Sequence, residues 1–310
     1  MPTMNGLIVV DKPAGLTSHD VVLRLRKILK VRRIGHAGTL DPLATGVLLI
    51  TVGQATRLFP YLSGLDKTYS GEIRLGLATD TYDSEGQSTG PESNEFPEEK
   101  KLLEAAASFT GEINQLPPPY SAKKINGQPA FRLARQGLRP ELNPVKVIIH
   151  RFLLLDYRPP LVKFMVECSS GTYIRSLAHD LGQKLGCGAH LSALRRVASG
   201  LYTEEEALSL EKIEQLAREK NYEQFLLPLD RLLSEYPAVW LDEQGIRLFT
   251  HGGGFGLRHV SRANLAGQYR QNPPVFRVFS GGNRLLGLAR YEAAEQSFRP
   301  ELVLTSCQSD

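Results

Sequence analysis

Residues 34–46 read Ile-Gly-His-Ala-Gly-Thr-Leu-Asp-Pro-Leu-Ala-Thr-Gly and stand directly before the apolar run 47–50. The glycines relax the steric limits on the backbone, and Pro42 fixes φ immediately after Asp41, so this loop can hold one side chain in one orientation. We interpret Asp41 as the reactive group of a catalytic loop. The competing interpretation is that Asp41 caps a helical turn with Pro42 at its first position, which involves no chemistry.

The composition is that of an ordinary globular protein. The chain has 310 residues, of which 42% are hydrophobic and 23% charged, so one large domain or two are expected rather than a disordered or membrane protein. The N-terminus lacks a signal-peptide pattern, and no apolar run approaches the ~18 residues of a membrane span. Cys168, Cys187 and Cys307 are odd in number and far apart, which favours reduced thiols in a cytoplasmic protein.

Positive charge is concentrated in two segments. The net charge of +4 is modest, but residues 11–36 carry seven Lys or Arg against two acids, and residues 120–151 carry seven against one. Such segments can neutralise phosphates, although a single basic run is more often a solvated surface. The charge pattern therefore favours a nucleic acid partner without establishing one.

Hydrophobic periodicity predicts strands and helices in alternation over most of the chain. A helix capped by Ser18 is expected, because Val21, Val22 and Leu25 recur at helical spacing. From about residue 236 short strands dominate, and Gly281-Gly282-Asn283 is typical of a hairpin turn. The expected strands are 7–10, 47–52, 68–77, 145–157, 161–168, 238–241, 275–280, 285–291 and 301–304, and the other expected helices are 54–62, 98–109, one from about 172, and 203–219.

Several motifs resemble one known family. Residues 35–48 read Gly-His-Ala-Gly-Thr-Leu-Asp-Pro-Leu-Ala-Thr-Gly-Val-Leu and resemble the catalytic loop of the TruB-type tRNA pseudouridine-55 synthases, which convert the T-loop uridine of tRNA to pseudouridine. The similarity spans most of residues 5–235. The other matching segments are Val-Val-Asp-Lys-Pro-Ala-Gly at 9–15, Asp-Lys-Thr-Tyr at 66–69, Ser-Gly-Thr-Tyr-Ile-Arg-Ser at 170–176 and Gly-Cys-Gly-Ala-His-Leu at 186–191.

The resemblance implies an α/β (α+β) fold with a mixed, largely antiparallel sheet, whereas alternating strands and helices alone would also permit a doubly wound sheet. It implies a catalytic domain at 1–235 and a small C-terminal β-barrel at 236–310 that resembles a PUA-type RNA-binding module. A basic insertion at about 117–145 resembles the segment that closes over the T-arm of tRNA. Its candidate contacts to the RNA backbone are Lys123, Lys124, Arg132 and Arg135.

The resemblance also assigns roles to single residues. Asp41 is the catalytic aspartate, Tyr69 stacks against the target uracil, and Arg175 pairs with the aspartate. A guanidinium beside a carboxylate favours its ionised form, so this pairing has a physical use. Tyr173 and Leu194 match pocket-lining positions of the family. From the residues alone, the two tyrosines and the leucine could equally be packing residues, and Arg175 an ordinary helix arginine.

Three more residues are candidates for substrate binding. His36 is placed to support the displaced nucleotides of the T-loop, although a lone histidine is more often structural. Lys12 could contact a phosphate and Pro13 could wall the pocket. Either residue could instead belong to ordinary turn chemistry.

Isomerising uridine requires that the nucleotide leave its stack, that the N1–C1′ glycosidic bond break, and that C5 bond to C1′. The reaction uses no redox or group donor, so no cofactor and no metal are expected. The aspartate could attack C1′, attack C6 or act as a base at C2′, and the sequence does not choose among these roles. The expected partner is tRNA through its T-arm, with no membrane contact, no required protein partner and a monomeric state.

Two other functions remain open. The same surfaces could bind or fold the T-arm of tRNA without modifying it. An aspartyl-phosphate phosphohydrolase would require Mg²⁺ and a second acid near Asp41. P-loop nucleotide hydrolysis and zinc proteolysis are disfavoured, because the sequence contains neither GxxxxGK[ST] nor HExxH.

Overall fold

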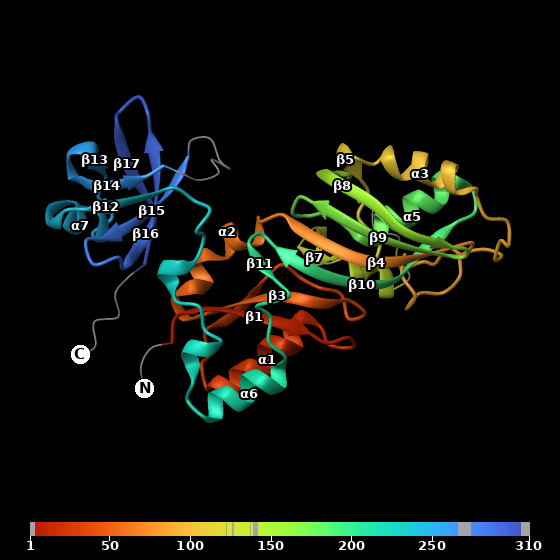
Figure 1. The fold of residues 1–310 in the computed structure, drawn as a ribbon, viewed down its shortest axis with the longest axis horizontal. Coiled ribbons are helices and arrows are strands. Elements are labelled where there is room, and N and C mark those ends of the chain that lie inside the picture. The colour runs from red at the N-terminus through yellow and green to blue at the C-terminus, as the bar shows by residue number, and fades with distance from the viewer. Residues whose placement is uncertain are drawn as a thin grey trace.

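The computed structural model describes residues 4–121, 123–125, 127–136, 138, 142–265 and 274–304 (Figure 1). Two sheets dominate this part of the chain, one formed by strands before residue 204 and the other by strands after residue 237. No helix in the described ranges is long and apolar enough to cross a membrane. Cys307 lies outside the described residues.

The larger sheet is mixed and largely antiparallel, as expected. Its strands follow the order β1-β3-β10-β4-β9-β8-β5, with β2 paired to β3 and β11 paired to β10. Strands β3 and β10 run parallel, and the neighbouring pairs run antiparallel, so the sheet is not doubly wound. The strands are β1 (Gly6–Lys12), β2 (Ile34–Ala37), β3 (Thr45–Val52), β4 (Lys67–Leu75), β5 (Gly111–Gln115), β8 (Val145–Arg158), β9 (Leu161–Cys168), β10 (Ala189–Ser199) and β11 (Tyr202–Thr203).

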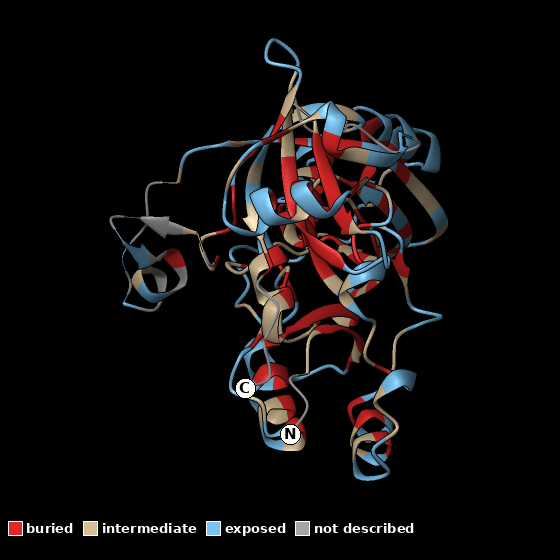
Figure 2. Cartoon of the chain, turned by 90° about the vertical axis from the view of Figure 1, so that its left-hand side faces the viewer, coloured by how far each residue is buried: buried red, intermediate tan, exposed pale blue. Residues whose placement is uncertain are grey.

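Two pairs of helices cover different halves of this sheet (Figure 1). Helices α1 (Ser18–Leu29) and α6 (Leu210–Arg218) contact each other beside β2 and β1, and α3 (Glu99–Ala107) and α5 (Ile174–Leu185) contact each other beside β8 and β10. Figure 2 shows the buried residues concentrated along the strands. The shorter elements are η1 (Gly53–Leu58), α2 (Phe59–Ser63), β6 (Lys124–Ile125), β7 (Gln128–Pro129), α4 (Ala130–Arg135), η2 (Tyr222–Gln224) and η3 (Leu229–Arg231).

The start of α1 corrects one expectation. Thr17 caps this helix, because its side chain accepts a hydrogen bond from the backbone N–H of Asp20 at 3.1 Å. Ser18, the expected cap, is buried and bonds to Leu40 instead, accepting from its N–H at 2.9 Å and donating to its carbonyl at 3.2 Å. The start of α1 is therefore tied to the residue that precedes Asp41.

Helix α6 and strand β10 also differ from expectation. Helix α6 begins at Leu210 rather than near residue 203, because Ser209 caps it and the preceding residues form β11 and a bridge to β1. Strand β10 was not expected at all, although it lies between β3 and β4 in the sheet. Two adjacent arginines interrupt its apolar pattern, and one of them, Arg196, points inward and is buried.

The second sheet has the order β13-β17-β16-β15-β12-β14 and is curled, which fits the expected PUA-like barrel (Figure 1). Helix α7 (Glu243–Thr250) was not expected; Asp242 caps it by accepting from the Gly245 N–H at 2.6 Å. The division of the chain at residue 235 stays a prediction. The elements are β12 (Ala238–Leu241), β13 (Phe255–Gly256), η4 (Leu257–His259), β14 (Val260–Asn264), β15 (Val275–Ser280), β16 (Leu285–Glu292) and β17 (Ser297–Val303).

Candidate active site

Asp41 and Arg175 form a bidentate ion pair. Asp41 lies in the loop between β2 and β3, and Arg175 is the second residue of α5. The Arg175 Nε lies 2.8 Å from Oδ2 of Asp41, and Nη2 donates to Oδ1 at 3.1 Å. The Asp41 side chain is 35% exposed and that of Arg175 only 7%, so a buried cation presents a carboxylate that solvent or substrate can reach. No helix follows Asp41, so the helix-cap interpretation is wrong.

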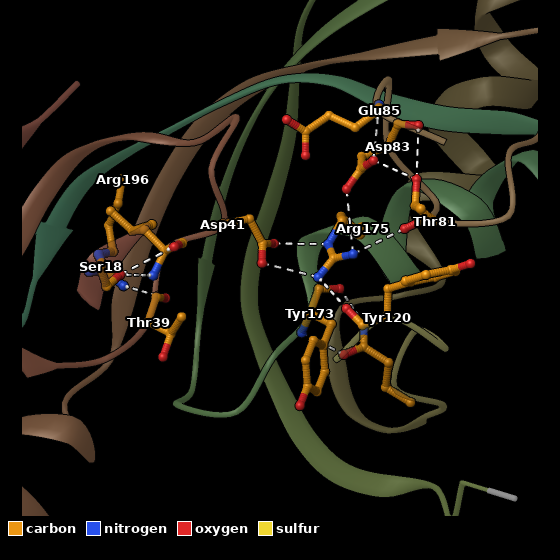
Figure 3. A network of polar contacts seen from close by, with 12 residues as sticks. Ser18, Thr39, Asp41, Thr81, Asp83, Glu85, Tyr120, Tyr173, Arg175 and Arg196 are labelled. Atoms are coloured by element: carbon orange, nitrogen blue, oxygen red, sulfur yellow. Dashed lines mark hydrogen bonds and ion pairs between the residues drawn. The ribbon is translucent and has the colours of Figure 1, made fainter. Parts of the chain in front are cut away.

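Arg175 is fixed from its other side as well (Figure 3). Its Nη1 lies 3.4 Å from Oδ2 of Asp83 and donates to the Thr81 carbonyl at 3.1 Å, while Nη2 donates to the Tyr120 carbonyl at 3.1 Å. Asp83 is 4% exposed. The guanidinium therefore has little freedom, and the orientation of the Asp41 carboxylate follows from it. Sequence reasoning missed Asp83, which lies in a polar turn with no motif of its own.

The five principal candidates surround one cavity. Asp41, Tyr69, Tyr173, Arg175 and Leu194 all line a hollow of about 250 Å³, although they come from four separate segments of the chain. Pockets for drug-sized ligands usually measure ~300–1,000 Å³, so this smaller cavity suits a group the size of a single nucleobase. Their convergence is what the expected chemistry requires.

Both tyrosines in the cavity are held in place. Tyr69 is buried on β4 beside Arg196 of β10. Tyr173 precedes α5, and Gln115 holds its backbone by accepting from its N–H at 2.7 Å and donating to its carbonyl at 3.0 Å. Burial raises the pKa of Tyr69 and of Tyr173. Both side chains are therefore neutral phenols at pH 7.

The side chain of Lys12 is enclosed by backbone carbonyls rather than open to solvent. Its side chain is fully buried, and Nζ donates to the carbonyls of Pro13 at 2.8 Å, Leu16 at 2.7 Å and Pro42 at 3.4 Å. Burial lowers the pKa of Lys12 to about 8. This ammonium joins the turn after β1 to the Asp41 loop, and the expected phosphate contact stays a prediction. Pro13 is exposed and is not among the residues that line the cavity, so its expected part in the pocket wall also stays a prediction.

Replacing Lys12 distinguishes these two roles. Lys12→Gln is expected to lower turnover about tenfold, because the Asp41 loop loses hydrogen bonds, while the salt dependence of RNA binding stays unchanged. A lost phosphate contact would instead reduce the slope of log affinity against log salt by about 1. Arg132→Gln, at an exposed arginine of α4, is the comparison expected to reduce this slope. Equal slopes for Lys12→Gln and Arg132→Gln, both below wild type, would contradict this interpretation.

His36, Lys123 and Arg132 are not among the residues that line the cavity. His36 is on β2; burial lowers its pKa, and its Nδ1 has no hydrogen-bond partner among the described residues. Lys123 donates to the Asn143 carbonyl at 3.0 Å, and Arg132 is exposed. The side chains of Lys124 and Arg135 lie outside the described residues. RNA contacts by these residues stay predictions.

Sequence reasoning also missed two buried cations that line the cavity, Lys67 and Arg196. Lys67 Nζ donates to the Ser63 carbonyl at 2.6 Å, which joins the start of β4 to the end of α2. Lysine and arginine are rarely buried, so a pattern of apolar positions does not reveal them. Lys67 lies in the segment 66–69, which resembles a family, whereas Arg196 lies in none of the matching segments.

The sequence of the larger sheet from β2 to β11 matches known family models. Residues 26–174 match "TruB family pseudouridylate synthase (N terminal domain)", and residues 175–234 match "tRNA pseudouridylate synthase B C-terminal domain". A protein of Syntrophotalea carbinolica named tRNA pseudouridine synthase B is 45% identical over 249 residues, which cover 80% of this chain and 81% of that protein. The chain belongs to the TruB family of pseudouridylate synthases.

Other TruB family members and relatives extend the match to the C-terminal sheet. A tRNA pseudouridine synthase B of Clostridium acetobutylicum is 40% identical over 308 residues, covering 97% of this chain and 100% of that protein. In a solved Cbf5-Nop10-Gar1 complex, one chain is similar with a TM-score of 0.76 and 27% identity, covering 97% of this chain and 85% of that chain. The resemblance to this family and the expected fold class are thereby confirmed.

Proposed function

We propose that this protein isomerises uridine 55 in the T-loop of tRNA to pseudouridine. The observation that carries the proposal is the partly exposed carboxylate of Asp41, held on both oxygens by the buried Arg175 in a cavity that Tyr69 also lines. The curated relatives are named tRNA pseudouridine synthase B, which supports tRNA as the substrate.

The reaction is a rearrangement in which no atoms are added to the nucleoside overall. The N1–C1′ bond breaks, the uracil turns within the cavity, the C5–C1′ bond forms, C5 loses a proton, and N1 gains one. Asp41 acts as a nucleophile at C1′ or C6 or as a base at C2′. Arg175 keeps both carboxylate oxygens oriented, and the ring of Tyr69 offers a stacking surface that offsets the cost of extruding the base.

The basic insertion at about 117–145 and the C-terminal segment 236–310 are proposed to bind tRNA outside the cavity. Exposed Arg132 is available for a phosphate contact. We propose that the protein acts as a cytoplasmic monomer, without a cofactor, a metal or a required protein partner. The two described cysteines, Cys168 and Cys187, are free thiols, in keeping with a reducing compartment.

The direct test is to incubate the purified protein with an unmodified T-arm hairpin and to map pseudouridine by mass spectrometry. We expect one pseudouridine, at the position that corresponds to residue 55 of tRNA. A matched hairpin with cytidine at that position should acquire none. Modification at another uridine, or none in either the hairpin or intact tRNA, would contradict the proposal.

Excess EDTA is expected to leave the rate of hairpin modification unchanged within about twofold. A phosphohydrolase would hold Mg²⁺ between Asp41 and a second acid, but here the guanidinium of Arg175 lies between Asp41 and Asp83. In the described part of the chain, no group of three or more His, Cys, Asp or Glu is arranged to hold a metal ion. The hairpin is used because intact tRNA needs Mg²⁺ to fold. Loss of activity that added Mg²⁺ restores would contradict this prediction.

A further inference from the structure

Arg196 occupies a central position between the two halves of the site. On β10 it lies opposite Gly46 of β3, five residues after Asp41, and opposite Tyr69 of β4. Its side chain is 1% exposed and is among the largest fully buried side chains of the described residues. It also lines the cavity that Asp41 and Tyr69 line. One buried cation therefore adjoins both the carboxylate loop and the phenol.

The contacts of Arg196 on one side are backbone carbonyls of the Asp41 loop and of β3. Nε donates to Val47 at 2.6 Å, Nη2 to Gly38 at 3.1 Å, and Nη1 to Thr39 at 3.5 Å; Figure 3 shows its guanidinium beside Thr39. The approach is close at Gly38, where φ is +93° and an added Cβ would lie 3.4 Å from Nη1. These bonds hold the loop three residues before its catalytic carboxylate.

On the other side, Arg196 lies directly opposite Tyr69 in the antiparallel β10–β4 pair; burial raises the pKa of the Tyr69 phenol, and the Arg196 guanidinium opposes that rise. No carboxylate among the described residues forms an ion pair with Arg196, in contrast to Arg175. A buried cation without a counterion is costly, so its retention calls for an interaction that needs the charge. Since a guanidinium carries only donors, the Tyr69 oxygen must be the acceptor in any hydrogen bond between the two side chains. The hydroxyl proton of Tyr69 then has to point away from Arg196.

We propose that Arg196 is a positioning residue that orients the Tyr69 hydroxyl with its proton toward the cavity, ready to donate to an acceptor atom of the bound nucleotide. Through its carbonyl contacts, the same side chain sets the phenol at a fixed distance from the Asp41 loop. The consequence for catalysis rests on the proposed function, but the orientation of Tyr69 is a property of the free protein. The two parts can therefore be tested separately.

The free protein is tested by fluorine NMR after all 11 tyrosines are replaced with 3-fluorotyrosine. Tyr69→Phe assigns the Tyr69 resonance. Arg196→Gln is expected to shift and broaden this resonance, because an amide can donate or accept and no longer fixes the hydroxyl. Arg195→Gln, at the neighbouring arginine paired with Asp11 and Glu204, is the control expected to leave it in place. An unchanged Tyr69 resonance in folded Arg196→Gln would overturn the proposal.

Single-turnover kinetics on the T-arm hairpin test the catalytic consequence. Arg196→Gln is expected to lower the rate at least 100-fold and Arg196→Lys about tenfold, because lysine is also donor-only, with hairpin affinity within threefold in both. In the Tyr69→Phe background, Arg196→Gln should lower the rate by less than a further threefold, because the two residues act as a unit. If Arg196→Gln and Tyr69→Phe together lowered the rate by the product of their separate effects, the proposal would be overturned. It would also be overturned if hairpin affinity fell in parallel with the rate. A wild-type protein that binds the hairpin without modifying it would contradict the proposed function instead, and the fluorine result would still decide the orientation.

Discussion

Asp41→Asn is expected to lower the rate of pseudouridine formation on the order of 10⁴-fold, the scale typical when an enzyme loses a charged catalytic side chain. Asparagine has nearly the same shape and keeps one oxygen that can accept from Arg175, so the cavity should persist. What it loses is the negative charge, and with it the capacity to attack carbon or to accept a proton. Hairpin affinity should stay within about threefold, since stacking and phosphate contacts elsewhere supply the binding.

Asp11→Asn is the matched control for this prediction. Asp11 is also a partly exposed aspartate in contact with an arginine, at 3.0 Å from Nη1 of Arg195, but it does not line the cavity. Its replacement should leave the rate within about twofold. If Asp41→Asn modified the hairpin as fast as wild type, the assignment of Asp41 would be wrong. If the wild type and Asp41→Asn both bound the hairpin and neither modified it, the function would be T-arm binding alone.

Four residues that line the cavity, Asp41, Tyr69, Tyr173 and Arg175, were predictable because each belongs to a short motif. Asp41 follows a glycine-rich loop, and Tyr69 and Arg175 lie in segments that resemble one family. The structure brings them together at one cavity, as expected. The role of each in catalysis stays a proposal, since proximity shows what can react and not what does.

The supporting layer could not be predicted, because its members owe their environment to distant segments. Asp83 becomes important only because α5 brings Arg175 to within 3.4 Å of it. Lys12 belongs to a matching motif, but whether an ammonium in a turn reaches phosphate or carbonyls depends on how the Asp41 loop packs over it. Strand β10 was not predicted for the same reason. Arg196 is buried by partners on β3 and β4, and the sequence of β10 does not show them.

Arg175→Met is expected to cost about 3–5 kcal/mol in the free energy of unfolding, the range seen when one partner of a buried ion pair is removed. Methionine fills much of the same space but leaves Asp83, 4% exposed, without its cation. Lys184→Met is the control on the same helix: this lysine is exposed, so the change should stay within about 0.5 kcal/mol. Urea denaturation followed by circular dichroism measures both.

A second substitution separates the uncompensated charge from simple loss of packing. In the double variant Arg175→Met/Asp83→Asn, the buried carboxylate is replaced by a neutral amide, which still accepts hydrogen bonds from Thr81 Oγ1 and the Glu85 N–H as Asp83 does. The double variant should therefore be more stable than Arg175→Met alone, even though it carries one substitution more. It should remain inactive, because the Asp41 carboxylate has lost the side chain that holds both its oxygens. If removing the Asp83 charge restored no stability, the ion pair would not be what organises this site, and the account of how Asp41 is oriented would fail with it.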